Sequence, residues 1–406
     1  MAGRPAAAAA LAVAIPVQDG KTGVPRGLEK AKALEAKQVT ASAHIKEEPR
    51  TPSRRKLGTG ETVSSSVYTP PDEGGARAYL DAQNWPHGLQ SILLKSCEKY
   101  PIRYFIIDDS GSMNTNDGHR VVGDRLDARK QKMVKCTRWS ELAACLHFHS
   151  ELSHAAKAPT EFRFLNMAEP ILVGNPSDQE GHGLDMFKRL IDEEGPGGQT
   201  PLCEQIRQVV SKISLIEEDL RSSGRKACVI VATDGEPTDG DLVEAMRPLQ
   251  QLPCWLVIRV CTDEEEIIKY WNNIDGELEI EMDVLDDLAG EAEEIRAVNP
   301  WLYYSESLHR LREFGSAMKE LDLIDESLLS SEQMAFVCSA LLCGPSDQRL
   351  PLPEIDFAEF ASQAKRLMSQ RPLVFDPILK SPAPVLNMGQ LSAKYDQNPS
   401  KSCVIV

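Results

Sequence analysis

The 406-residue sequence contains no apolar stretch that approaches the ~18 residues a membrane-spanning helix needs. Its ten cysteines include no CxxC pair and no close Cys/His spacing of the kind that binds zinc. Several cysteines, including Cys228, Cys254 and Cys261, lie within apolar runs, where a free thiol behaves as a small core side chain. These absences argue against a membrane-spanning or zinc-stapled protein, and they indicate reduced thiols in an intracellular location.

Positive charge is also in short supply. The chain has 45 lysines and arginines against 61 aspartates and glutamates, which gives a net charge of −16. A protein with this balance repels phosphate backbones at long range, so a nucleic-acid-coating role is disfavoured. The hydrophobic content of 42% and the charged content of 26% are typical of a soluble globular protein. We therefore expect a cytoplasmic protein that does not bind nucleic acid.

Both ends of the sequence carry short targeting patterns. Arg4 precedes an apolar stretch with an A-x-A at residues 12–14, as in a signal peptide, but this stretch is short and dominated by alanine. The final residues, CVIV, fit the C-a-a-X pattern for prenylation of Cys403. A secreted chain never meets a cytosolic prenyltransferase, so we favour the C-terminal pattern. One prenyl chain would tether the protein to membranes only weakly.

Composition and periodicity divide the chain into five segments. Residues 1–75 are rich in Ala, Lys, Glu, Ser, Thr and Pro without an apolar period, and we expect them to be disordered. The other predicted segments are a helical lead-in at 76–102, an α/β domain at 103–285, a helical extension packing on that domain at 286–370, and an extended or disordered tail at 371–406 that ends in the CaaX-like box.

Short apolar runs alternate with amphipathic helical patterns between residues 103 and 285. RYFIIDD, ACVIVATD and CWLVIRVCT read as buried strands. Strands that are apolar throughout indicate a parallel sheet covered on both faces. The predicted fold class is therefore α/β, with a doubly wound, mostly parallel sheet, helices on both faces and a C-terminal helical extension.

Three polar stretches lie where strands end or helices begin. They are DDSGS at 108–112, GGQT at 197–200 and TDGEPTD at 233–239. In doubly wound sheets, ligands bind at the carboxyl ends of the strands. Each stretch supplies oxygen ligands of the kind that Mg²⁺ prefers.

These residues resemble the metal-ion-dependent adhesion site (MIDAS) of von Willebrand factor type A (VWFA) domains, which combines D-x-S-x-S, a distant threonine and an aspartate in a T-D-G strand end. The matching positions are Asp108, Ser110, Ser112, Thr200 and Asp234. The resemblance implies a Rossmann-type fold that binds Mg²⁺ (or Mn²⁺), with hydroxyls as direct ligands and the aspartates acting largely through water. It also implies an electrophilic metal that accepts one more oxygen, from a Glu or Asp of a partner protein.

Two further features surround this pattern. Asp109 fills a variable position of the motif, where it is expected to hydrogen-bond loop amides or shape the outer shell of the metal. The insert at 113–137 is longer than the expected turn and contains Asp117, His119 and Asp124. These three are candidate additional ligands, but we favour a polar surface loop.

Two other kinds of site deserve comparison. A metal-assisted phosphoester hydrolase could use Asp108, but such chemistry wants a second carboxylate two residues on, where this chain has Ser110. His147, Glu151 and His154 share a helix face but lack the H-E-x-x-H order, so an ordinary helix surface is favoured. The leading interpretation is a non-catalytic, metal-dependent protein-interaction module, with the hydrolase as the alternative.

Overall fold

The computed structural model describes residues 68–396, apart from Ala168, Gln179, Asp263, Glu279 and Ala317. The lipidation expected at Cys403 lies outside the described residues, as do residues 1–67 of the segment 1–75 that was expected to be disordered. Within the described part of that segment, a helix begins at Glu73.

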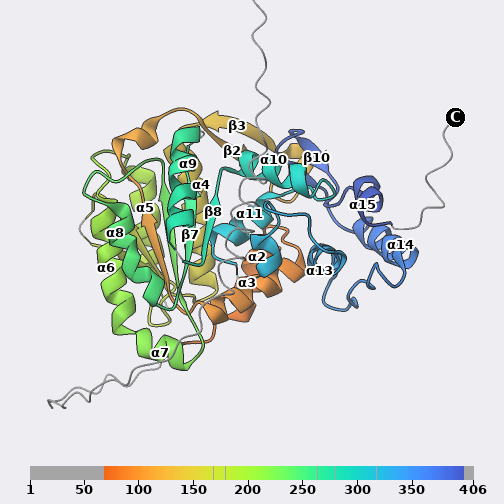
Figure 1. The fold of residues 1–406 in the computed structure, drawn as a ribbon, viewed down its shortest axis with the longest axis horizontal. Coiled ribbons are helices and arrows are strands. Elements are labelled where there is room, and N and C mark those ends of the chain that lie inside the picture. The colour runs from red at the N-terminus through yellow and green to blue at the C-terminus, as the bar shows by residue number, and fades with distance from the viewer. Residues whose placement is uncertain are drawn as a thin grey trace, which may run out of the picture.

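A six-stranded sheet forms the centre of the protein, with the strand order β5-β4-β1-β6-β7-β8 (Figure 1). All neighbouring strands are parallel except β5, which runs antiparallel to β4. The strands are β1 (Arg103–Ile107), β4 (Thr160–Phe164), β5 (Ile171–Val173), β6 (Ala227–Thr233), β7 (Cys254–Val260) and β8 (Met282–Leu285). The expectation of an α/β fold with a mostly parallel sheet is confirmed.

Helices cover both faces of this sheet. On one face, α4 and α5 bury Leu146 and Phe187 against the strands. On the other face, α6, α8 and α9 bury Ile206 and Trp271. The bounds are α4 (Arg138–Ala155), α5 (His182–Glu193), α6 (Leu202–Leu215), α7 (Glu217–Ser222), α8 (Leu242–Met246) and α9 (Glu265–Glu277). In the described part of the chain, every helix is too short or too polar to cross a membrane.

The expected lead-in helix is two helices, α2 (Glu73–Asp81) and α3 (His87–Lys99). The chain turns between them at Asn84, whose φ of 60° is left-handed. Pro86 follows at the N-cap of α3, and a proline disfavours helical backbone in the residue before it.

The insert at 113–137 is a β-hairpin and not an irregular surface loop. After a short 3₁₀ turn, η1 (Gly111–Asn114), β2 (Gly118–Val122) pairs antiparallel with β3 (Lys132–Cys136). A second 3₁₀ turn, η2 (Ala128–Lys130), lies in the connection. The hairpin forms its own two-stranded sheet and packs against α4 rather than joining the central sheet.

The C-terminal extension builds a separate core with α2, α3 and part of α4. Trp301 is fully buried in this core, which also includes Leu152 of α4. The elements are α10 (Leu288–Val298), α11 (Glu306–Glu313), α12 (Lys319–Asp322), α13 (Ser331–Leu342), α14 (Phe357–Met368), β9 (Val374–Asp376), β10 (Ser381–Ala383) and α15 (Met388–Tyr395). The sequence was expected to be extended after residue 371, and α15 corrects that expectation.

Burial in α15 makes residues 371–396 an integral part of this core. Leu391 is 0% exposed, so Leu391→Ala should lower the free energy of unfolding by about 2–4 kcal/mol through the cavity that it leaves. Leu379, which is 56% exposed, provides the matched control, and Leu379→Ala should stay within about 0.5 kcal/mol of the native chain. Urea unfolding of the full chain measures both, and equal effects would contradict the packing of α15.

Candidate functional site

Four of the five predicted ligands meet at the carboxyl ends of β1 and β6. Because these strands are parallel neighbours, Asp108 after β1 and Asp234 after β6 lie at the same edge of the sheet. The Ser112 hydroxyl donates to Oδ1 of Asp234 over 2.8 Å. The Ser110 and Ser112 hydroxyls are 2.9 Å apart, and since Ser112 gives its proton to Asp234, Ser110 is the donor between them. A chain of hydrogen bonds thus runs from Ser110 to Asp234.

Asp108 is almost completely buried beneath these serines. Its Oδ1 accepts from the backbone N–H of Ser110 over 2.9 Å, and its Oδ2 accepts from the Thr233 hydroxyl over 2.6 Å. Burial raises the pKa of Asp108, and the hydrogen bonds from Ser110 and Thr233 oppose that rise. Both of these partners are electrically neutral, so they orient the carboxylate without balancing its charge.

Thr200 reaches this edge from the loop before α6. Thr200 is buried. Its carbonyl accepts a hydrogen bond from the Thr238 amide over 2.9 Å, and its amide donates to the Thr238 hydroxyl over 3.2 Å. The same loop touches the serine motif, because the Gly111 amide donates to the Gly198 carbonyl over 3.2 Å. Thr200 is therefore fixed in place by main-chain contacts.

Asp109 fastens two loops together. Its Oδ1 accepts from both the backbone amide and the side-chain amide of Asn166, over 3.0 and 2.8 Å. Its carbonyl accepts from the Gly197 amide over 2.7 Å. Of the two roles expected for Asp109, these contacts correspond to hydrogen bonding of loop amides.

Arg138 is the site residue that the sequence did not reveal. Its Nη1 donates to Oδ2 of Asp234 over 2.9 Å, and its Nε and Nη2 donate to Asp117 over 2.8 and 2.6 Å. Nη2 also donates to Glu264 over 2.7 Å. Arg138 begins α4 directly after the insert, but nothing in its sequence position indicates contact with a strand end 96 residues away.

The three candidate ligands of the insert serve other purposes. The hydrogen bond from Arg138 lowers the pKa of Asp117. The His119 amide donates to Glu141 over 2.7 Å, and Asp124 accepts from the Leu126 amide over 3.0 Å. Only Asp117 is connected to the predicted site, and that connection runs through the arginine.

The helical histidines are engaged separately. His147 lies 2.9 Å from Asp192, and Glu151 accepts from the Tyr79 hydroxyl over 3.1 Å and pairs with Lys188. Partners on different elements support the interpretation of this face as an ordinary helix surface.

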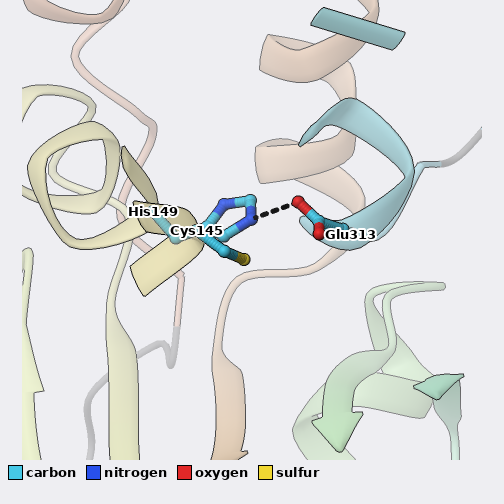
Figure 2. Close-up of side chains that lie close together, drawn as sticks. All are labelled: Cys145, His149 and Glu313. Carbon is cyan, nitrogen blue, oxygen red and sulfur yellow. Dashed lines mark hydrogen bonds and ion pairs between the residues drawn. The ribbon is translucent and has the colours of Figure 1, made fainter. Parts of the chain in front are cut away.

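A second group of metal-ligating residue types lies in the interior. Cys145 and His149 occupy successive turns of α4, and Glu313 ends α11; their ligand atoms all lie within 4.8 Å of one another (Figure 2). His149 Nε2 is 3.4 Å from Glu313 Oε2. All three residues are buried, so the group deserves comparison with a closed metal site.

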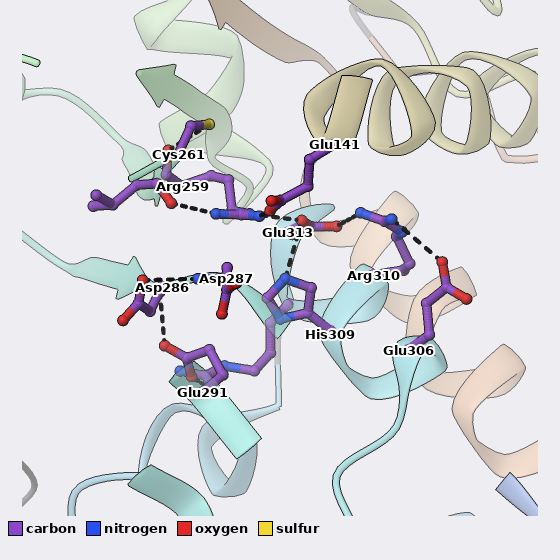
Figure 3. A network of polar contacts seen from close by, with 12 residues as sticks. Glu141, Arg259, Cys261, Asp286, Asp287, Glu291, Glu306, His309, Arg310 and Glu313 are labelled. Carbon is purple, nitrogen blue, oxygen red and sulfur yellow. Dashed lines mark hydrogen bonds and ion pairs between the residues drawn. The ribbon is translucent and has the colours of Figure 1, made fainter. Parts of the chain in front are cut away.

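Arginines already neutralise the carboxylate of this group. Arg259 Nε donates to Oε1 of Glu313 over 3.0 Å, and Arg310 Nη1 donates to Oε2 over 2.7 Å (Figure 3). Although burial opposes ionisation, the charge of Arg310 holds the pKa of Glu313 well below its usual range. Burial and the charge of Glu313 raise the pKa of Cys145 well above its usual range, so its thiol keeps its proton. We interpret the group as a structural ion-pair network.

The remaining group, Glu291, Glu294 and Asp325, also adjoins a buried arginine. Arg312 is 1% exposed and donates to Glu291 over 2.6 Å and to Asp325 over 3.1 Å. It also donates to Asp283 at the start of β8, over 3.0 Å. The extension is therefore joined to the sheet by a second arginine-centred network.

Comparison with known proteins gives no match: no family model fits the sequence, and no curated protein matches it. The functional interpretation therefore depends on the residues, their geometry and the resemblance of the motif.

Removal of the Glu313 charge should destabilise the fold. In Glu313→Gln, Arg259 and Arg310 keep their charges in a buried site, so we expect a loss of about 3–5 kcal/mol in the free energy of unfolding. Glu265→Gln is the control: Glu265 is 78% exposed in its pair with Lys269, so its loss should cost about 0–1 kcal/mol. Urea unfolding at neutral pH distinguishes the two, and similar values would contradict the structural role of Glu313.

Stability should also fall in mild acid. Burial lowers the pKa of His149 and of His309, so the folded chain keeps both neutral while the unfolded chain takes up protons below pH of about 6.5. The stability present above that pH is lost as pH falls, by up to about 1.4 kcal/mol per pH unit for each histidine. Urea midpoints between pH 7.5 and 5.5 measure the slope.

The variant His149→Phe tests this assignment, because the ring of His149 is stacked on Phe314 and a phenyl ring can take its place. The variant should show a shallower pH dependence than the native chain. A slope that does not change would show that other groups cause the acid sensitivity.

Proposed function

We propose that the chain is a non-catalytic, metal-dependent protein-interaction module of the VWFA type. In this proposal Mg²⁺ (or Mn²⁺) lies among Asp108, Ser110, Ser112, Thr200 and Asp234, and a Glu or Asp of a partner protein supplies the remaining ligand. The observation that carries the proposal is the 2.8 Å hydrogen bond from Ser112 to Asp234, which joins the serine motif to a strand end 122 residues away.

The hydrogen-bond directions fit an ion of this kind. Ser110 and Ser112 use their protons within the chain that ends at Asp234. The Ser110 oxygen therefore keeps both lone pairs for a cation, and the Ser112 oxygen, which accepts from Ser110, keeps one. Hydroxyl and carboxylate oxygens are the ligands that Mg²⁺ prefers. The donor set therefore suits a hard divalent ion.

Charge balance supports the same conclusion. Asp108 and Asp234 repel each other, and Asp234 raises the pKa of Asp108 in addition to the larger effect of burial. The one cation in contact with either carboxylate, among the described residues, is Arg138, and it is shared with Asp117 and Glu264. A divalent ion would offset the excess negative charge.

The serines, the aspartates and the ion would then each have a separate role. The serine hydroxyls hold the ion without reducing its charge, and the aspartates orient the hydroxyls and bound water. The ion supplies an electrophilic position that a partner carboxylate can fill. Binding of the partner would therefore require the metal.

The alternative, a metal-assisted phosphoester hydrolase, finds less support. A second carboxylate is needed close to Asp108 as acid or base, and Ser110 stands at the relevant position. The neighbouring carboxylate, Asp109, accepts two hydrogen bonds from Asn166 and is committed to that loop. A binding role is therefore favoured.

Calorimetric titration of the full chain with Mg²⁺ and Mn²⁺ tests the metal site. We expect one site in the native chain and an affinity about 10–100-fold lower in Asp108→Ala, the range seen when a residue that orients metal ligands is removed. Asp185→Ala, at an exposed position on α5, should bind as the native chain does. Identical titrations for the native chain and Asp108→Ala would refute the site.

The same preparations distinguish binding from hydrolysis. With saturating Mg²⁺, the interaction module should release no nitrophenol from p-nitrophenyl phosphate above the background of Asp108→Ala. Turnover that depends on both Mg²⁺ and Asp108 would favour the hydrolase.

A further inference from the structure

An open groove runs along α4 and begins beside the serine motif. Its volume is about 500 Å³, and its walls are the β2–β3 hairpin on one side and the end of α5 on the other. At one end, the Asn114 side chain donates to the carbonyls of Gly111 and Pro196 over 3.3 and 3.0 Å, which joins the groove to the D-x-S-x-S loop. At the other end, His147 lies 2.9 Å from Asp192. The groove thus begins next to the loop that carries Ser110 and Ser112.

The floor of the groove can accept an apolar side chain. Ala143 and Ala144 leave space above α4, and Trp139 presents a half-buried indole beside them. Trp139 is held from beneath by Phe164, with ring centroids 6.3 Å apart. Rigid aromatic side chains of this kind are frequent anchor points in protein interfaces.

The two walls carry opposite charges. Arg120 lies on the hairpin wall and is exposed, whereas the α5 wall ends in three consecutive exposed carboxylates, Asp192, Glu193 and Glu194. An extended polyanion, such as a nucleic acid or an anionic membrane, would be repelled by this wall and by the net charge of −16. A segment with charges of both signs matches both walls.

We propose that this groove holds a peptide segment of the partner protein, one that places a carboxylate at the metal, an apolar side chain over Trp139, Ala143 and Ala144, and a lysine or arginine against Glu193 and Glu194. The inference rests on the proposed metal-dependent function and adds the chemistry of the partner to it. Coordination of the partner carboxylate by the metal would hold the segment in place, and contacts in the groove would distinguish one acidic partner from another.

Panning of a random dodecapeptide phage library tests this assignment. The full chain is immobilised in Mg²⁺, and bound phage are released with EDTA. The released peptides should share an Asp or Glu together with a Lys or Arg. Synthetic copies are then titrated by fluorescence anisotropy against the native chain and its variants.

Three variants separate the groove from the metal. Ala144→Trp fills the floor, and Glu193→Gln combined with Glu194→Gln removes charge without changing shape; each should weaken peptide binding by about tenfold, the equivalent of one good contact. Leu215→Trp, at a position that is 86% exposed and belongs to α6, is the control and should leave binding unchanged. Calorimetry should give the native Mg²⁺ affinity for all variants, which also shows that they are folded.

The outcomes are distinguishable. EDTA-released peptides that bind the groove variants as tightly as the native chain would overturn the groove and leave the metal-dependent function standing. If Mg²⁺ binds but EDTA releases no peptides, the groove proposal is overturned and the metal site alone stands. A native chain that binds no Mg²⁺ would overturn both proposals.

Discussion

The ion pairs of Glu313 with Arg259 and Arg310 are the interaction on which the rest of this structure depends. A buried carboxylate is costly unless cations compensate it, and here those cations come from different elements: Arg259 from β7 and Arg310 from α11. Arg259 also pairs with Glu141 of α4, whose carboxylate accepts the His119 amide of the hairpin over 2.7 Å. One polar network therefore connects the extension, the sheet, α4 and the hairpin. Displacing the extension, the sheet or α4 would leave a buried charge without its partner, and displacing the hairpin would remove a hydrogen bond from Glu141.

The cost of leaving a buried carboxylate without a cation also explains why the edge of the sheet is a candidate metal site and the interior is not. Glu313 forms ion pairs with Arg259 and Arg310, so its charge is balanced within the protein. Within residues 68–396, the hydrogen-bond partners of Asp108 are the neutral residues Thr233 and Ser110, and Asp234 shares a single arginine with two other carboxylates. Oxygen ligands with uncompensated charge are what a divalent cation requires. Cys145 and His149 offer softer ligands, yet their carboxylate is already committed.

Much of the sheet could be predicted because β1, β6 and β7 are mainly apolar and because β1 and β6 end in polar loops. That pattern also placed Asp108 and Asp234 at one edge before any contact was known. What the sequence could not supply were pairings between distant residues, such as Arg138 with Asp234, since charge at one position does not identify its partner. Helix α15 and the strands of the hairpin were not predicted for a different reason, which is the weakness of their local sequence patterns. Helix α15 buries only Leu391 and Tyr395, and β2 and β3 alternate charged with partly buried residues, so neither pattern was long enough to stand out from a loop.

The hairpin shows how an insertion can enter such a site without disturbing it. Its base is closed by Arg138, whose side chain pairs with Asp117 and whose amide donates to the Thr115 carbonyl over 3.0 Å. Because Arg138 also pairs with Asp234, the residues before and after the hairpin are joined to the strand end of β6. Surface loops on such a fixed base tolerate changes in length and sequence, so the hairpin can vary while the strand end keeps its position. The arginine thus anchors the base of the hairpin at the edge of the sheet that carries Asp108 and Asp234. The hairpin and the end of α5 form the walls of the neighbouring groove.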